Sequence, residues 1–378
     1  MEAPVTEASA IQAVSALELA GMPATLKPGR AIPHRKVLRS WMRAWSTRRT
    51  GHALLLLLID SVLFLAAIGA TVVLRATLMK LLAGCAAGFV IGRLFILGHD
   101  ACHQSFTPHR RLNKLLGRIA FLPSLTPYSL WDVGHNVVHH GYTNLKGVDF
   151  VWAPSTLEEF EAFSPPRQWL ERLYRSGWAP WLYYLVEIWW LRMYFPSRRY
   201  VQVRRAVFLR DGWLVTAFAA LWIACLVLAA QATAQSVFAL LGFGFMLPFL
   251  FWNGMIGFVV YVHHTHVRVN WHADKVRWGA AQPFVSTTVH LTFRFGIGAV
   301  LHHIMEHTAH HVDMGIPLYH LKPAQQALED HLPGVIIVQP FSWRWYFDTA
   351  KRCKLYDLDR ASWTDFAGAP TVQAAVGP

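Results

Sequence analysis

Four apolar stretches dominate the hydrophobic pattern of this 378-residue chain. They run over residues 52–73, 78–97, 213–230 and 237–262. Because a bilayer core of about 30 Å takes roughly 20 residues of helix, each stretch is long enough to span a membrane. A few residues around Arg75 join the first pair, and residues 231–235 join the second. Neither connection can hold a domain, so each pair predicts a helical hairpin.

Two further apolar stretches are too short or too polar to span a bilayer. Residues 116–125 form the first, and residues 178–195, which are rich in Trp and Tyr, form the second. Aromatic residues at this density favour a helix that lies in the lipid head-group region. The alternative is a buried core helix in the part of the protein outside the membrane.

The charge pattern predicts the orientation in the membrane. Lys and Arg outnumber Asp and Glu by 35 to 22. They gather before, between and after the hairpins, whereas the two short turns carry almost no charge. By the positive-inside rule, both termini and the long middle segment face the cytoplasm. A nucleic-acid partner is not expected, because no basic run has the aromatic interleaving or fold signature of such proteins.

These patterns together predict an all-α membrane protein with four transmembrane helices in two hairpins and a cytoplasmic helical cap. The expected parts are a cytoplasmic N-terminal segment over residues 1–50, a membrane domain over 51–345 and a C-terminal tail over 346–378. Two ionisable residues lie within the apolar spans. We expect Asp60 to face the bundle interior and Arg93, near the cytoplasmic end, to extend toward the head groups.

Most of the 20 histidines fall in four clusters that share one side of the membrane. The clusters are H-D-A-C-H (His99, His103), H-N-V-V-H-H (His135, His139, His140), H-H-T-H (His263, His264, His266) and H-T-A-H-H (His307, His310, His311). Histidines four apart share a helical face, and neutral imidazole is the commonest protein metal ligand. Four such clusters on one side predict a metal centre, although imidazole alone does not name the metal. Nearby acids are candidates to orient the rings, namely Asp100, Asp132, Asp149, Glu306 and Asp313.

Several motifs are absent from the sequence, which narrows the chemistry. There is no E-x-x-H motif of soluble di-iron carboxylate bundles and no H-E-x-x-H zinc-protease motif. Phosphate-binding and dinucleotide-binding glycine motifs are also missing, so neither ATP hydrolysis nor bound nicotinamide is indicated. A histidine-rich metal transporter is a distant alternative. It predicts ionisable residues along a path at mid-membrane depth, whereas these histidines lie at span ends.

The histidine clusters resemble the three histidine boxes of integral membrane fatty acid desaturases. The resemblance covers residues 50–345 and includes G-H-D-A-C-H-Q-S-F, V-G-H-N-V-V-H-H-G-Y-T-N and E-H-T-A-H-H-V-D-M-G-I-P-L-Y. The last two are similar to the bacterial acyl-lipid omega-6 (delta-12) group. The resemblance implies a di-iron site held by nine histidines, with His266 as the alternative to His264: His99, His103, His135, His139, His140, His264, His307, His310 and His311.

The resemblance also implies an activity. It is O₂-dependent insertion of a double bond into a lipid-linked acyl chain, at the delta-12 (omega-6) position of an oleoyl group. Candidates to line an acyl channel are Trp131, Trp152, Phe251 and Trp252. A separate ferredoxin or cytochrome would supply electrons, because no cytochrome b5 motif (H-P-G-G) is present. A membrane di-iron hydroxylase of alkanes, carotenoids or sphingolipids is the main alternative.

Overall fold

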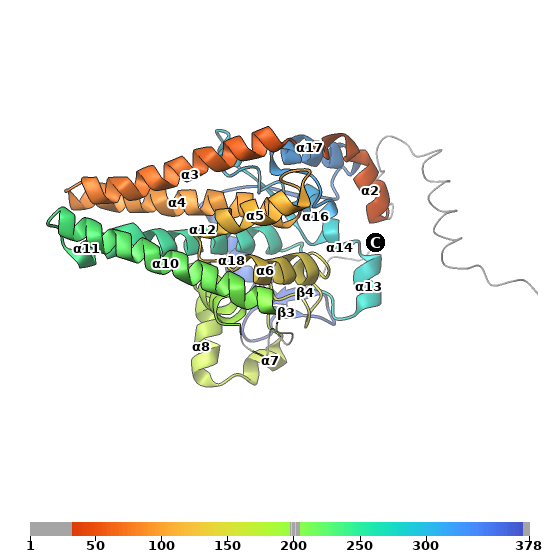
Figure 1. Ribbon diagram of the computed structural model, residues 1–378. Coiled ribbons are helices and arrows are strands. Elements are labelled where there is room, and N and C mark those ends of the chain that lie inside the picture. The colour runs from red at the N-terminus through yellow and green to blue at the C-terminus, as the bar shows by residue number, and fades with distance from the viewer. Residues whose placement is uncertain (1–31, 197, 199–200, 202–204, 373–378) are drawn as a thin grey trace, which may run out of the picture.

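The chain folds mainly into helices, as expected from its sequence. The computed structural model describes residues 32–196, 198, 201 and 205–372. Three of its four longest helical units are α3 (Thr50–Val73), α4 (Thr77–Cys102) and α10 (Ala206–Ala232). The fourth unit, Val237–His264, consists of α11 (Val237–Leu241), a π-turn η4 (Gly242–Met246) and α12 (Leu247–His264). All four are long and apolar enough to cross a membrane. The prediction of four spans in two hairpins is confirmed, and Figure 1 shows the hairpins side by side.

The turns of the two hairpins contact each other at one end of the molecule (left in Figure 1). Arg75 Nη1 donates to the carbonyl of Thr233 at 2.9 Å, and Lys80 Nζ donates to Gln235 Oε1 at 2.6 Å. Gln235 Nε2 in turn donates to the carbonyl of Val72 at 2.8 Å. The opposite ends of α4 and α12, which carry histidines, therefore also lie on a common side.

Small residues on α4 bring it close to α12. Gly84 and Gly88 lie one turn apart, and a Cβ atom at either would collide with a backbone carbonyl of Phe243 or Pro248. Glycine at such positions is the usual way in which membrane helices approach closely. As a result, α4 and α12 run close together, and each carries a histidine in its last turn, His99 and His264.

A buried ionic cluster links α3 and α4 to the segment before α16 (His307–Val312). Asp60 is fully buried, as expected. Arg93 pairs with it: its Nε and Nη2 atoms donate to Asp60 Oδ1 at 2.9 and 2.8 Å, and its Nη1 atom donates to the carbonyl of Val300. His302 Nε2 contacts Asp60 Oδ2 at 2.6 Å. Pairing with the buried carboxylate compensates for the partial removal of Arg93 from water.

The remaining elements form a cap beside the histidine-bearing ends of the spans. Its helices and turns are α2 (Arg35–Trp41), η1 (Arg43–Trp45), α5 (Arg110–Phe121), α6 (Tyr128–Trp131), η2 (Asp132–His139), α7 (Leu157–Glu161), α8 (Pro165–Tyr174), α9 (Pro180–Tyr183), η3 (Tyr184–Tyr194), α13 (Lys275–Ala280), α14 (Pro283–Ser286), α15 (Ile297–Val300), α16, η5 (Leu318–His320), α17 (Leu321–His331) and α18 (Trp343–Arg352). Two small sheets complete it: β1 (Val289–Thr292) pairs in parallel with β2 (Ile337–Pro340), and β3 (Leu355–Asp357) pairs antiparallel with β4 (Ser362–Thr364).

Two regions of the cap add detail to the sequence expectations. Residues 178–195 form α9 and the π-helix η3, with buried Tyr184 and Trp189 on one face and exposed Trp181 and Trp190 on another. They therefore combine a core-packing face with an exposed aromatic face. Within the segment 346–378, the described residues to 372 are folded, because the β3–β4 hairpin packs against Trp271.

Candidate metal centre and adjoining cavity

Five histidines from three elements converge on one point. His99 and His103 come from the end of α4, His135 and His140 from η2 and its C-cap, and His310 from α16. Their Nε2 atoms form a chain of short contacts, at 3.2 Å for His103–His99, 2.8 Å for His135–His99, 3.1 Å for His140–His135 and 3.2 Å for His310–His140. We call these residues the five-histidine group.

Four more histidines form an adjacent four-histidine group: His139, His264, His307 and His311. The Nε2 atom of His307 lies 3.0 Å from Nε2 of His264 and 3.0 Å from Nε2 of His311. The His139 ring centroid is 4.6 Å from that of His264. The structure thus brings together all nine histidines named from the sequence, divided five to four. The rings of His140 and His311, one from each group, stack at 4.1 Å, so the groups are neighbours.

The π-helical turn η2 determines how the second histidine motif is shared between the groups. In a π-helix the backbone bonds run from residue i+5 to residue i. Here His140 N donates to the carbonyl of His135 at 2.9 Å, and both rings belong to the five-histidine group. His139 points instead into the four-histidine group. An α-helix would place His135 and His139 on one face, so the π-turn reverses that pairing.

Two polar neighbours fix the proton position on clustered rings. Asp149 places both carboxylate oxygens 3.1 Å from His139 Nδ1. Thr143 Oγ1 donates its proton to the carbonyl of His139 at 2.8 Å and lies 3.2 Å from His311 Nδ1. Since a carboxylate oxygen and a hydroxyl whose proton is already donated accept hydrogen bonds, these contacts favour the tautomer of His139 and His311 with the proton on Nδ1. Their Nε2 lone pairs are free for a cation.

Asp149 is the only one of the five candidate acids to contact a clustered histidine in the described part of the chain. The other four bind elsewhere: Asp100 to Ser105, Asp132 to Asn136, Glu306 to His303 and Asp313 to Arg39. Sequence proximity could not separate these cases, because the loop that returns Asp149 to His139 is a tertiary feature. Thr143 has no distinguishing signal in the sequence.

The fourth histidine cluster contributes one ring to the groups. His264 lies in the four-histidine group, whereas His266 faces away, with Nδ1 accepting from Arg268 N at 3.1 Å. His263 stacks on the His307 ring at 3.7 Å, and its Nε2 lies 3.2 Å from Met305 Sδ. It therefore supports a clustered ring from outside both groups.

The donor set fits a pair of metal ions. Nitrogens that bind one ion at right angles, each at about 2.1 Å, lie about 3 Å apart, which matches the Nε2 separations here. Burial lowers the pKa of six rings well below the usual range, and neighbouring rings lower it further, so these imidazoles are neutral donors: His103, His135, His140, His307, His310 and His311. Each neutral ring has a single N–H, so a shared cation satisfies the converging Nε2 atoms better than hydrogen bonds alone.

An apolar cavity adjoins both groups. On one side it is lined by His99, His135, His139, His264 and His307, and on the other by Phe150, Val151, Tyr184, Ile188 and Met193. Of the aromatic residues expected to line a channel, Trp131 does so. The other three have the alternative role of ordinary packing or surface residues: Trp152 and Trp252 are buried in packing contacts, Trp252 against the lining residue Tyr184, and Phe251 is partly exposed. The lining from η3 was missed, since its pattern indicated only a helix.

Comparison with known proteins agrees with this geometry. The model of the fatty acid desaturase family matches residues 75–343. The sn-1 oleoyl-lipid 12-desaturase of Synechocystis sp. is 30% identical over 273 residues, 71% of this chain and 74% of that protein. The enzyme of that name from Picosynechococcus sp. is 28% identical, over 72% and 75%. The chloroplastic omega-6 fatty acid desaturase of Spinacia oleracea is 28% identical, over 72% of this chain and 58% of that protein. This chain therefore belongs to the fatty acid desaturase family.

Proposed function

We propose that this membrane desaturase inserts a double bond at the delta-12 (omega-6) position of a lipid-linked oleoyl group, using O₂. The observation that carries the proposal is the apolar cavity that opens onto both histidine groups. Saturated hydrocarbon offers no charge or hydrogen bond to recognise, so an apolar cavity beside a metal centre suits it. The position of the double bond is inferred from the names of the similar Synechocystis and Picosynechococcus enzymes.

The nine grouped histidines are the proposed ligands of two iron ions. His99, His103, His135, His140 and His310 would hold one ion, and His139, His264, His307 and His311 the other. Bound iron would supply the reduction of O₂ and the oxidising power to remove hydrogen from an unactivated CH₂. The protein holds the rings by Asp149, Thr143 and His263. It also excludes water, because the cavity lining outside the histidines is almost entirely apolar.

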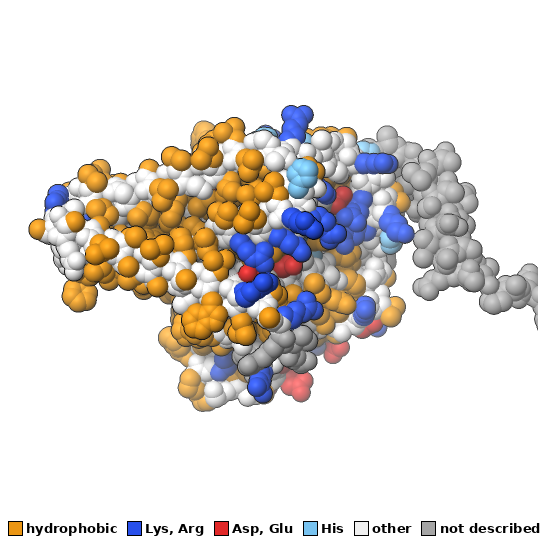
Figure 2. Space-filling model, viewed as in Figure 1, with side chains coloured by type: hydrophobic (Ala, Val, Ile, Leu, Met, Phe, Trp, Pro, Cys, Tyr) orange, Lys and Arg blue, Asp and Glu red, His pale blue; other side chains and the backbone are white. Residues whose placement is uncertain are grey.

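The reaction requires electrons from a partner. Conversion of –CH₂–CH₂– and O₂ into –CH=CH– and two waters consumes two electrons and two protons beyond those taken from the acyl chain. We assign this role to a separate ferredoxin or cytochrome. The excess of Lys and Arg, which Figure 2 shows gathered beyond the apolar surface of the spans, suits an acidic donor.

We place both termini and the histidine groups on the cytoplasmic side of a bacterial inner membrane. The support is the concentration of basic residues away from the hairpin turns (Figure 2). In this arrangement residues 1–50 and 346–378 lie in the cytoplasm, and the turn that contains Ala234 lies on the far side.

Expression in a bacterial host that lacks polyunsaturated lipids tests the proposed function. We expect new dienes with double bonds at carbons 9 and 12 in the fatty acid profile. His310→Ala should abolish them, and His109→Ala, an exposed ring outside both groups, should retain them. Hydroxylated acids in place of dienes would identify a hydroxylase, and dienes that persist in His310→Ala would refute the proposed ligand set.

A further inference from the structure

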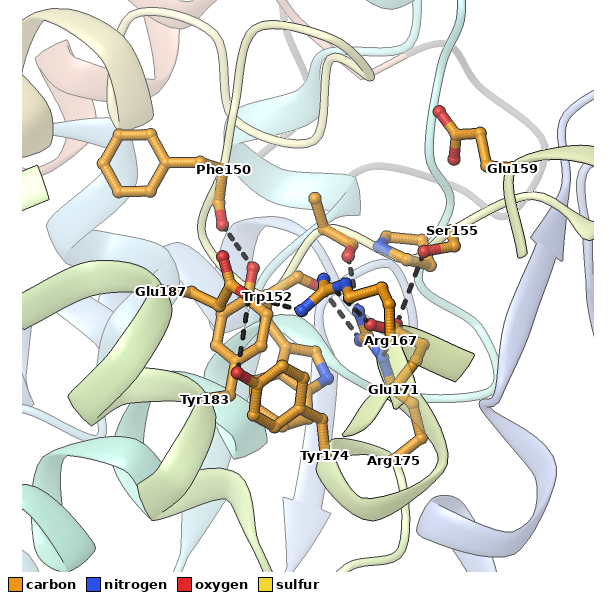
Figure 3. Close-up of polar contacts among 12 residues, drawn as sticks. Phe150, Trp152, Ser155, Glu159, Arg167, Glu171, Tyr174, Arg175, Tyr183 and Glu187 are labelled. Atoms are coloured by element: carbon orange, nitrogen blue, oxygen red, sulfur yellow. Dashed lines mark hydrogen bonds and ion pairs between the residues drawn. The ribbon is translucent and has the colours of Figure 1, made fainter. Parts of the chain in front are cut away.

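The cavity wall opposite the histidines comes from two segments that are separate in the sequence. Phe150 and Val151 lie in the loop of residues 149–153, and Ile188 and Met193 lie in η3. A partly buried ionic cluster at α8 connects both segments (Figure 3). We call it the α8 clasp, and it consists of Arg167, Glu171, Arg175 and Glu187.

Arg175 binds the loop. Its side chain is 1% exposed, and Nε donates to Glu171 Oε1 at 2.9 Å. Its Nη1 donates to the carbonyl of Trp152 at 3.3 Å, and its Nη2 donates to the carbonyl of Ala153. The guanidinium also lies over the Trp152 ring, 4.9 Å from its centroid. A single planar group thus holds two consecutive carbonyls and one ring of the loop.

Arg167 and Tyr183 extend the same cluster to η3 and to the cavity lining. Arg167 Nη1 donates to Glu187 Oε1 at 2.6 Å, and its Nη2 donates to Glu171 Oε2 at 3.3 Å. Glu187 belongs to η3, so α8 is bound to both wall segments. Tyr183 OH donates to the carbonyl of Phe150 at 2.8 Å, which fixes the loop at a residue that lines the cavity.

The loop needs such restraint because its backbone is not in a relaxed conformation. Trp152 has a φ of 53°, in the left-handed region that costs a bulky residue about 1 kcal/mol or more. A buried ion pair, moreover, adds little net stability over apolar packing. The distinctive property of Arg175 is geometric, since its planar, forked guanidinium donates to Glu171 and to two backbone carbonyls at the same time.

We propose that Arg175 is a positioning residue that sets the cavity wall, and thereby the segment of the acyl chain that faces the histidines. The inference rests on the proposed desaturase function. It assigns to the α8 clasp a role in where the double bond forms, although no clasp residue belongs to either histidine group.

Arg175→Lys tests the proposal in the full-length membrane protein, with Arg172→Lys as the matched control. Arg172 is on α8 too, but its guanidinium lies over Phe160 and Phe366, away from the cavity. Lysine retains the charge and loses the fork. A shift of about 1 Å at the reacting carbon is worth on the order of 100-fold in rate. We therefore expect the fraction of products with a displaced double bond to rise at least about tenfold in Arg175→Lys and to stay at the parent level in Arg172→Lys.

Tyr183→Phe is the second variant, because it loosens the same loop without disturbing a buried charge. Tyr183→Phe should displace the double bond in the same way. If Arg175→Lys is not recovered from the membrane, the double-bond position in Tyr183→Phe alone tests the proposal. An unchanged double-bond position in both variants, at whatever total yield, overturns the proposal. If the parent chain forms no unsaturated product, the proposed function fails on its own. In that case hydrogen exchange over residues 149–153 tests whether Arg175 restrains the loop. Faster exchange in Arg175→Lys than in Arg172→Lys supports this role of Arg175, and equal exchange in the two variants overturns it.

Discussion

Single residues decide whether the clustered rings can act as ligands. Nine imidazoles crowded together would be a costly burial of polar groups if their protons pointed at one another. Asp149 and Thr143 prevent this at His139 and His311, because each accepts the Nδ1 proton and turns the Nε2 lone pair toward the group. His263 restrains His307 by stacking. Restraint by such neighbours contributes to metal affinity almost as directly as the ligands do.

Asp149→Asn should lower metal affinity by about 10- to 100-fold, because the amide no longer gives His139 a charged acceptor. Iron or cobalt bound per purified chain, titrated by mass spectrometry, measures the change. Asp132→Asn is the control, since Asp132 contacts Asn136 and Cys102 and no clustered histidine. Equal metal affinity in both variants would show that Asp149 is not needed to orient the ring.

His264→Ala and His266→Ala should differ sharply, although only one residue separates them. His264 Nε2 is in the four-histidine group, whereas His266 Nδ1 is occupied by the amide of Arg268. We expect metal affinity of the four-histidine group to fall at least about tenfold in His264→Ala and to be retained in His266→Ala. The opposite pattern, read from metal content of the two purified proteins, would exchange their roles.

For single residues, the sequence predicts which histidines come together but not which neighbouring side chains orient their rings. The histidine motifs are visible because spacing along a helix repeats in sequence. Asp149 was one of five equivalent candidates, and Thr143 and Arg175 had no signal at all. Their roles depend on loops that fold back over many residues, which local periodicity does not encode.

Among the elements, η2 is the one whose helix type matters most for the site. Its H-N-V-V-H-H motif places the first and last histidines five residues apart, and the π-turn accommodates this spacing by bonding His140 N to the carbonyl of His135. In an α-helix with one residue fewer, the first and last histidines would be four apart and would still share a face. The π-turn therefore compensates for the five-residue spacing of His135 and His140.

Deletion of Val137, which is 59% exposed, should convert η2 to an α-helix and preserve the metal site. His135 and His140 then become i and i+4, on one face. Deletion of both Val137 and Val138 leaves them three apart and turns the intervening ring away, so metal content and diene production should fall at least about tenfold. Loss of metal in the single deletion, with the protein still folded, would contradict the idea that the π-turn compensates for the five-residue spacing.

The spans could be predicted from sequence because an apolar run of about 20 residues is typical of a membrane helix and of few other structures. The contribution of η3 to the cavity could not, since its aromatic residues are divided between a buried and an exposed face. Arg93 illustrates the same limit. Its position near a span end suggested the head groups, whereas its ion pair with Asp60 of the neighbouring helix depends on how the helices pack.

For the whole molecule, the decisive feature is that every histidine-bearing end lies on one side. The two hairpin turns contact each other through Arg75, Lys80 and Gln235, so the ends of α4 and α12 that carry His99 and His264 emerge together. The cap segments η2 and α16 then complete both groups. The nine histidines come from four segments, so they meet only if the two hairpins are aligned along their length. The sequence indicates this alignment only because all four histidine clusters fall on the same side of the membrane.

That sidedness predicts a labelling pattern in whole cells. The test starts from a chain in which serine replaces the four cysteines, Cys85, Cys102, Cys225 and Cys353. A new cysteine in the hairpin turn, Ala234→Cys, should then react with a membrane-impermeant maleimide added outside the inner membrane. Cysteines on the cap, Lys36→Cys and Lys351→Cys, should react only after the membrane is opened. Because the basic residues near the cap resist translocation, the reverse pattern is not expected. If the cap cysteines react in intact cells, the histidine groups face away from the cytoplasm, and a cytoplasmic ferredoxin or cytochrome could not be the electron donor.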